Sequence, residues 1–133
     1  MKILLFLTGL TLTTSQLPPD SAKAWADLVS KYKTECLCAT KADPAVVERW
    51  LYKYSFPNDA CLKCFIKCVT EKLGLLNYDG SVNVDANLAL DSVIPKMSAN
   101  MTYSCTNKTA NVSDICEKAF QYSFCIQTAI KNA

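Results

Sequence analysis

The sequence predicts an all-α fold, a single bundle of about six helices cross-linked by three or four disulfides. Apolar residues recur at helical spacing through most of the chain, and sustained strand-like alternation is missing. In addition, eight cysteines stand in a chain of only 133 residues. A chain of this length forms one domain with one modest core.

The first fifteen residues have the pattern of a secretory signal peptide. Lys2 gives a positive start, Ile3 to Leu12 is an apolar stretch, and Thr13 and Ser15 occupy the small-residue positions of a cleavage site. The stretch is too short to span a bilayer, which takes about 20 residues; a buried N-terminal helix is the alternative interpretation. We therefore expect a signal peptide at 1–15, a single mature domain at 16–133, and a secreted protein without membrane insertion.

In an exported chain of this size, an even number of cysteines predicts a disulfide framework. Short spacings, such as that between Cys61 and Cys64, also occur in zinc and redox sites. Zinc needs free thiolates, and a redox pair normally lies on a βαβ scaffold that this pattern lacks. We therefore expect disulfides and no metal.

The first half of the domain begins with two predicted helices. Asp20 follows two prolines and begins a helix whose apolar face runs from Trp25 to Cys36. Asp43 gives an N-cap, and Pro44 occupies the first helical position of the second helix.

Two further helices are predicted in the middle of the chain. Pro57-Asn58-Asp59 begins the third helix, and Gly74 is placed to end it in a left-handed conformation. A fourth, shorter helix is expected from about Val84 to Ile94, where Pro95 stops it.

The last two predicted helices complete the bundle. One surrounds Cys105, and the other begins near Ser113 or Asp114, with Glu117 available for a capping box.

Six cysteines stand in a specific order along these helices. Intervals of 27, 3, 36, 10 and 8 residues separate Cys36, Cys64, Cys68, Cys105, Cys116 and Cys125, in that order, and the three- and eight-residue intervals are the specific ones. This order resembles the six-cysteine signature of the insect pheromone- and general-odorant-binding family. The segments Cys64-Phe-Ile-Lys-Cys68 and Cys116-Glu-Lys-Ala-Phe120 are also typical of it. The resemblance covers essentially the whole mature chain.

The resemblance implies six helices around an internal apolar cavity, with interlocked bridges Cys36–Cys68, Cys64–Cys116 and Cys105–Cys125. Two cysteines depart from the family pattern, namely Cys38 and Cys61. We expect these two to form a fourth bridge. The swapped pairing, Cys36–Cys61 with Cys38–Cys68, stays open.

The implied ligand site is a largely preformed apolar pocket with a few polar groups that fix the ligand's orientation. Tyr54 and Tyr122 are candidates to supply a hydroxyl group. For each candidate, ordinary core packing is the alternative. The expected lining residues are Tyr54, Phe56, Phe65, Leu76, Leu88, Val93, Met97, Met101, Phe120, Phe124, Ile126 and Ile130.

The chain contains no histidine. This excludes Ser-His-Asp and Cys-His catalysis as well as histidine-metal sites, so we expect neither an enzyme nor a cofactor. It also removes the side chain that most readily triggers ligand release near pH 6. We therefore expect ligand binding to change little between about pH 5 and pH 7.

Three sequons lie close together, at Asn100-Met-Thr102, Asn107-Lys-Thr109 and Asn111-Val-Ser113. Each is an N-glycosylation acceptor in a secreted protein. The alternative is that a segment rich in Asn, Ser and Thr generates sequons by chance.

Three functions are compatible with these features. The first is a carrier of odorants, pheromones or lipids to a membrane chemoreceptor, and the second is a scavenger of lipids or biogenic amines in another secreted fluid. The third is a disulfide-rich signalling protein with a solid interior. Lys and Arg are scattered and the net charge is only +2, so we expect no nucleic-acid partner. We expect a monomer or a weak homodimer.

Overall fold

The computed structural model describes residues 16–133, and the predicted signal peptide lies outside this range. The described residues form an all-α bundle, as predicted, and their only strand-like pairing is an isolated bridge between Leu76 and Val82. The elements are α2 (Pro19–Ser30), α3 (Lys33–Thr40), α4 (Pro44–Lys53), α5 (Ala60–Lys72), α6 (Val84–Ala89), the 3-10 helix η1 (Leu90–Ser92), α7 (Ala99–Thr109) and α8 (Ile115–Asn132).

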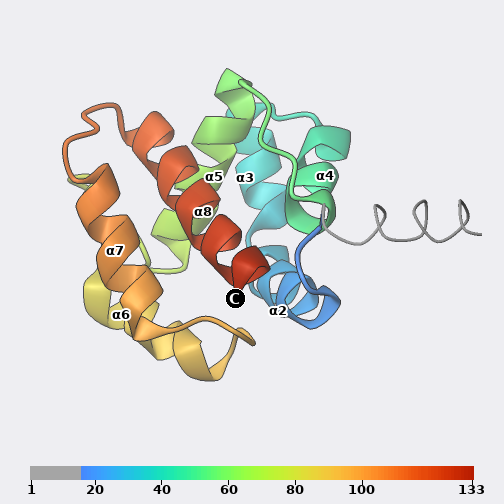
Figure 1. Ribbon diagram of the computed structural model, residues 1–133. Coiled ribbons are helices and arrows are strands. Elements are labelled where there is room, and N and C mark those ends of the chain that lie inside the picture. Colours follow the sequence, from blue (N-terminus) through green and yellow to red (C-terminus); the bar gives the residue numbers. More distant parts are fainter. Residues whose placement is uncertain (1–15) are drawn as a thin grey trace, which may run out of the picture.

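Helix α8 lies in the middle of the bundle, and its packing against α5 is the most extensive helix contact (Figure 1). On one side, α7 packs against α8 and α6 packs against α7. On the other side, α3 packs against α5, and α2 packs against α4. The C-terminal end of α8 comes close to α2 in the view of Figure 1.

Aspartates cap three of the helices at the predicted positions. The carboxylates of Asp43, Asp59 and Asp114 each accept a hydrogen bond from a backbone N–H in the first turn of α4, α5 and α8, respectively. These bonds satisfy donors that have no partner inside the helix. The reciprocal half of the expected capping box at α8 is not formed, because the Glu117 carboxylate instead accepts from Lys63 and Gln121.

Residues 16–133 form seven α-helices and η1 where about six helices are predicted, because two of the predicted helices are divided. The first bends at Tyr32, whose φ of −120° and ψ of 5° are not helical, into α2 and α3. The bend lets α2 pack on α4 and α3 pack on α5, which a straight helix would not achieve. The helix expected to reach Ile94 is α-helical only to Ala89 and continues as the tighter η1.

Three bridges join the helices as the family resemblance implies. They are Cys36–Cys68 between α3 and α5, Cys64–Cys116 between α5 and α8, and Cys105–Cys125 between α7 and α8.

The fourth bridge expected between Cys38 and Cys61 is not formed, and the swapped pairing is not observed. Both side chains are exposed free thiols. Cys38 follows Cys36 by two residues, a rotation of about 200° around a helix. Because Cys36 is fully buried toward α5, this rotation points the Cys38 side chain away from α5.

Buried side chains form two clusters. One surrounds Trp50 and Phe65, which are fully buried between α4 and α5. The other joins Leu17, Ile94 and Ile130 at the opposite end of the bundle. Among the described residues, no helix is both long and apolar enough to cross a membrane.

Candidate functional site

A cavity lies inside the bundle, between the two buried clusters. With its opening to solvent included, the space between its lining atoms is about 660 Å³. The enclosed part is much smaller, a void on the order of 200 Å³ between the walls, which holds about ten non-hydrogen atoms.

Helix α8 supplies one long wall of the cavity. Its lining side chains recur at helical spacing, which places them on a single face. Leu75, Leu76, Val82 and Thr70 line the adjoining region near the end of α5. The lining residues from α8 are Ala119, Tyr122, Ser123, Ile126, Gln127 and Ile130.

The opposite wall comes from α2 and from the chain around η1. Ser21 and Trp25 lie one turn apart on α2, and Leu17 lies just before the helix begins. The Ser21 hydroxyl donates to the carbonyl oxygen of Pro95 at 2.6 Å, which fastens the segment after η1 to α2. This segment contributes Ile94 and Met97, and α6 and η1 contribute Asn87 and Leu90.

Polar groups in the wall are mostly paired with one another or with the backbone. The Tyr122 hydroxyl donates to Asn87 Oδ1 at 3.2 Å, and burial raises the pKa of Tyr122 above its ordinary value. Asn87 Nδ2 donates to the carbonyl oxygen of Leu75 at 3.0 Å. The Thr70 hydroxyl donates to the carbonyl oxygen of Ile66 at 2.7 Å.

Two polar atoms of the wall have no partner. Trp25 Nε1 and Gln127 Oε1 are both buried, and neither forms a hydrogen bond within residues 16–133. The Gln127 amide is held from its other end, because its Nε2 donates to Ser123 Oγ at 3.3 Å. Ser123 Oγ also accepts from Trp50 Nε1 at 3.2 Å.

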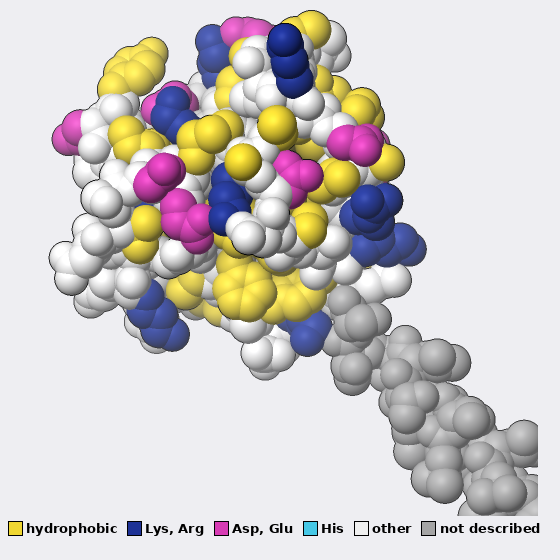
Figure 2. All heavy atoms as spheres, turned by 90° about the horizontal axis from the view of Figure 1, so that it is seen from above, with side chains coloured by type: hydrophobic (Ala, Val, Ile, Leu, Met, Phe, Trp, Pro, Cys, Tyr) yellow, Lys and Arg dark blue, Asp and Glu magenta, His cyan; other side chains and the backbone are white. Residues whose placement is uncertain are grey.

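The cavity carries no formal charge. Its lining contains no Asp, Glu, Lys or Arg side chain. Figure 2 shows acidic and basic side chains interspersed over the visible face of the molecule rather than gathered by sign. Within residues 16–133, no group of three or more Cys, Asp or Glu residues comes together as a metal site.

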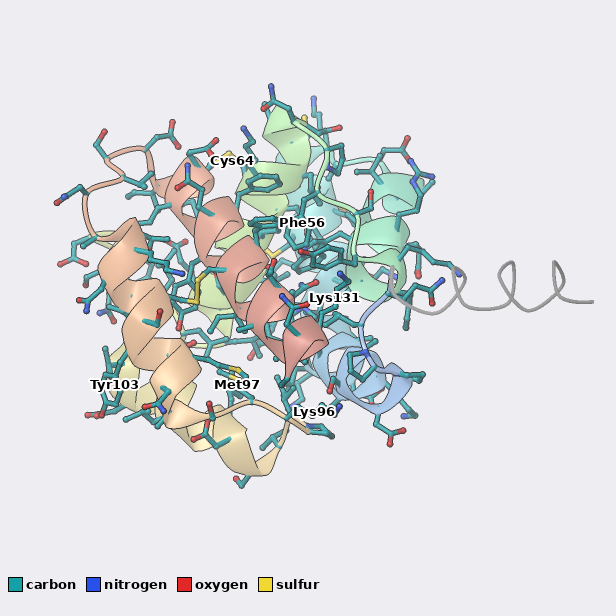
Figure 3. The ribbon with its side chains drawn as sticks, in the orientation of Figure 1. Phe56, Cys64, Lys96, Met97, Tyr103 and Lys131 are labelled. Atoms are coloured by element: carbon teal, nitrogen blue, oxygen red, sulfur yellow. A yellow bond between two sulfur atoms is a disulfide. The ribbon has the colours of Figure 1, made fainter. Side chains whose placement is uncertain are left out.

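The structure places four of the twelve expected lining residues at the cavity: Leu76, Met97, Ile126 and Ile130. Tyr122, the second candidate hydroxyl, is there as well. Met97 lies in the lower half of the molecule in Figure 3, near the segment that leads into α7.

Four of the remaining eight form an aromatic cluster on the outside of α8, and not in the cavity. Phe56 contacts Tyr54, Phe120 and Phe124, with ring centroids 5.1–5.5 Å apart. The Tyr54 hydroxyl pairs with that of Thr128. In Figure 3, Phe56 lies between α8 and α4, well away from Met97.

The other four also lie away from the cavity. Phe65 is packed edge-on against Trp50 in the buried core, and Val93 is 48% exposed. Met101 lines a shallow groove on the outside between α7 and α8. Leu88 is half-buried and does not line the cavity.

Sequence reasoning missed most of the α2 wall. Leu17 lies before the predicted helix start at Asp20, and Ser21 and Gln127 are polar. The four-residue spacing of Ser21 and Trp25 within α2 was the available signal.

All three sequon asparagines are exposed. Thr102 and Thr109, which complete the first two sequons, are buried within α7. Asn111 and Ser113, by contrast, are both exposed in the loop between α7 and α8.

The chain resembles known proteins in sequence and in structure. General odorant-binding protein 99a of Drosophila melanogaster is 30% identical over 100 residues, covering 71% of this chain and 69% of the relative. General odorant-binding protein 99b of the same organism is 23% identical over 109 residues, covering 76% and 71%. The solved structure of odorant-binding protein dmelOBP28a from Drosophila melanogaster matches with a TM-score of 0.63 at 19% identity, over 85% of this chain and 97% of that one. Residues 20–129 match the model of the PBP/GOBP family, so the chain belongs to that family.

Proposed function

We propose that the chain binds a small, neutral, largely apolar molecule in its internal cavity and carries it through an extracellular fluid. The cavity itself is the observation that carries this proposal. It lies inside a shell held by three bridges, and its wall is formed mainly by Leu, Ile, Met and aromatic side chains. A few polar groups among apolar walls are the usual composition of a small-molecule site.

The cavity limits the ligand's size and charge. A void on the order of 200 Å³ holds about ten non-hydrogen atoms, which is the size of a volatile compound. A charged ligand would leave water without gaining a charged partner, because no Asp, Glu, Lys or Arg lines the wall.

We further propose that the protein is secreted, acts as a monomer or weak homodimer, and delivers its ligand to a membrane chemoreceptor. Support comes from the signal-peptide pattern of residues 1–15, the bridges and the family. The relatives are named as odorant-binding proteins, which favours an odorant or pheromone as the ligand.

The alternatives have less support. A scavenger of biogenic amines needs a carboxylate in the wall, and a lipid carrier needs a larger void than this one. A signalling protein is expected to have a solid interior, so this function would leave the cavity without a role. We propose no enzymatic activity.

A substitution in the cavity wall tests ligand binding. Ala119 lines the cavity on α8, whereas Ala129 lies on the outer side of the same helix, along the α7–α8 groove. Ala119→Leu places three additional carbon atoms in the void, and Ala129→Leu makes the same change outside it. We expect the full chain, produced in a secreting eukaryotic host, to bind a neutral volatile such as 2-octanone with a micromolar Kd.

Calorimetric titration measures the Kd of the wild type and of each variant. We expect Ala119→Leu to weaken binding at least tenfold and Ala129→Leu to change it less than twofold. Equal effects of the two variants, or no saturable binding of any neutral volatile by folded wild-type protein, would contradict the proposal.

A further inference from the structure

We propose that the outer side of α8 is a docking surface for a lipid bilayer with anionic headgroups, which the protein contacts at the level of the headgroups. We call this surface the outer α8 face. It joins the aromatic cluster beside α4 to the groove between α7 and α8, and its main residues are Tyr54, Phe56, Lys108, Phe120, Phe124 and Lys131. The proposal concerns the outside of the bundle and does not depend on the ligand in the cavity.

The pattern of α8 itself gives this face its direction. Phe120, Phe124, Thr128 and Lys131 follow one another at intervals of four, four and three residues, which places them in one stripe along the helix. None of the four lines the cavity. Helix α8 therefore turns one side toward the cavity and a second, largely apolar side outward.

Phe124 connects the two parts of the outer α8 face. Its ring packs against those of Tyr54 and Phe56, with centroids 6.0 and 5.1 Å apart, and its side chain also lines the groove. It is nevertheless 45% exposed. The groove is lined as well by the apolar side chains of Met101 and Ala129. A contiguous exposed apolar surface marks a site of contact with another molecule or a membrane, whereas single exposed apolar residues are ordinary.

The charged side chains of this face are basic. Lys131 Nζ lies 5.0 Å from the centroid of the Tyr54 ring, and Lys108 lines the groove. Neither lysine forms an ion pair with an Asp or Glu side chain within residues 16–133. Lys63, at the edge of the aromatic cluster, is instead balanced by Glu117 at 2.6 Å. Two uncompensated positive charges beside apolar rings are complementary to a partner that is both anionic and apolar.

An anionic bilayer surface combines these two properties. Its headgroups attract lysine side chains, and the boundary between headgroups and acyl chains accommodates aromatic rings. In Figure 3, Phe56 and Lys131 lie on the same side of α8, toward α4, so both can meet one surface. A second copy of the chain is disfavoured as the occupant, because a symmetric contact through this face would bring Lys108 and Lys131 of both copies together.

Vesicle sedimentation with the full chain tests the proposal. The probes are vesicles of phosphatidylcholine alone and vesicles of phosphatidylcholine mixed with phosphatidylserine. We expect wild-type protein to bind the mixed vesicles at least tenfold more tightly at low salt, and we expect high salt to remove this preference.

A charge variant tests the contribution of lysine. Lys131→Gln removes one cation from the face, so we expect binding to the mixed vesicles to weaken about fivefold. Lys41→Gln changes the net charge equally but lies at the exposed end of α3, and it is the matched control. We expect this control to alter binding less than twofold.

An aromatic variant tests the apolar part of the face. Phe124→Ser removes the exposed ring, and we expect binding to the mixed vesicles to weaken at least threefold. Tyr103→Ser removes a ring that is 53% exposed on α7 but does not line the groove, and Figure 3 shows it far from Phe56. This control is expected to bind like wild type.

The outcomes are separable from those of the proposed function. Equal binding of wild-type protein to the two kinds of vesicle, no binding to either, or equal effects of the face variants and their controls would overturn the docking surface. Binding to acidic proteins without binding to vesicles would overturn it as well. The Kd of 2-octanone is expected to be unchanged in Lys131→Gln and Phe124→Ser, which shows that both variants are folded with the cavity intact.

Discussion

Asn87 connects three parts of the cavity wall through one buried side chain. It is 2% exposed, and its Nδ2 donates to the carbonyl oxygens of Leu75 and Asn83, while its Oδ1 accepts from the Tyr122 hydroxyl. These bonds link α6 to the chain after α5 and to α8. An asparagine buried in this way holds the wall in one geometry, because each of its partners would otherwise be an unpaired buried group.

Replacement of Asn87 is therefore expected to destabilise the whole protein. Asn87→Leu keeps a similar volume but leaves the Tyr122 hydroxyl buried without its acceptor, at a cost of about 2 kcal/mol in the free energy of unfolding. Guanidinium unfolding followed by circular dichroism measures this change. Asn132→Leu, at the exposed end of α8, is the control and should stay within about 0.5 kcal/mol of wild type. Equal stability of Asn87→Leu and wild type would contradict the role given to this side chain.

Single residues of the site were only partly predictable, and α8 shows why. Both faces of this helix are rich in apolar or aromatic residues, so hydrophobic spacing does not reveal which face is inward. Phe120 and Phe124 have larger apolar side chains, so they were predicted to line the cavity. The inward face instead includes the small Ala119, because a cavity exists where side chains do not fill the space.

At the scale of elements, α7 differs from its neighbours in composition and exposure. It is rich in Asn, Ser and Thr, and apart from the buried Thr102, Cys105 and Thr109 most of its side chains face solvent or the outer groove. The loop that follows carries Asn111 and Ser113, both exposed and outside any helix. A glycan on this loop would project into solvent, away from the cavity.

We therefore expect N-glycosylation at Asn111 in protein secreted from eukaryotic cells. Intact-mass measurement before and after treatment with an amidase that removes N-glycans should show one glycan, which Asn111→Gln abolishes. Asn100→Gln and Asn107→Gln are matched controls, because their sequons lie in α7 with the threonine buried. Loss of the glycan in either control would instead mean that attachment occurs before α7 folds.

Element boundaries were predicted well wherever a capping residue marks them. Asp43, Asp59 and Asp114 begin α4, α5 and α8 as expected, because a carboxylate before an apolar helix is a local signal. The bend at Tyr32 has no such signal. It is fixed by the separate neighbours of α2 and α3, and this tertiary information does not appear in the spacing of apolar residues.

At the scale of the whole molecule, ion pairs join the helices from outside. Lys63 in α5 contacts Glu117 in α8 at 2.6 Å, and Lys72 in α5 contacts Glu35 in α3 at the same distance. The hydrogen bond from Lys63 is the main reason why the pKa of Glu117 lies below its usual 4.5. A carboxyl group with a lowered folded-state pKa stabilises the protein above its unfolded pKa, and this contribution is lost as the pH falls through the folded pKa.

The free energy of unfolding and the ligand Kd are therefore expected to be nearly constant between about pH 5 and pH 7, where the chain has no histidine to titrate. Below about pH 4.5, stability should decline as Glu117 takes up a proton. Thermal unfolding across this range measures the effect, and Glu117→Gln should decline less steeply. Glu48→Gln, which alters the exposed pair with Lys33, is the control. A steep loss of stability or binding between pH 7 and pH 5 would contradict the expectation.

The all-α class was predictable from helical spacing along the entire chain, and the three bridges were implied by the resemblance of the cysteine order to the family. That Cys38 and Cys61 are free thiols was not predictable. Their pairing depends on which way each helix is turned about its axis, and a two-residue offset on α3 is enough to separate them.

The bridges also divide the cavity into a tethered wall and an untethered one. Cystines connect α3, α5, α8 and α7 in series, whereas α2, α4, α6 and η1 carry no cysteine in any bridge. The Gln127 side of the cavity is thus covalently anchored, and the Trp25 side is held by packing and hydrogen bonds alone. We therefore expect movement of the cavity wall to be concentrated on α2 and α6, so that ligands of different shape would be accommodated on that side while α8 stays in place.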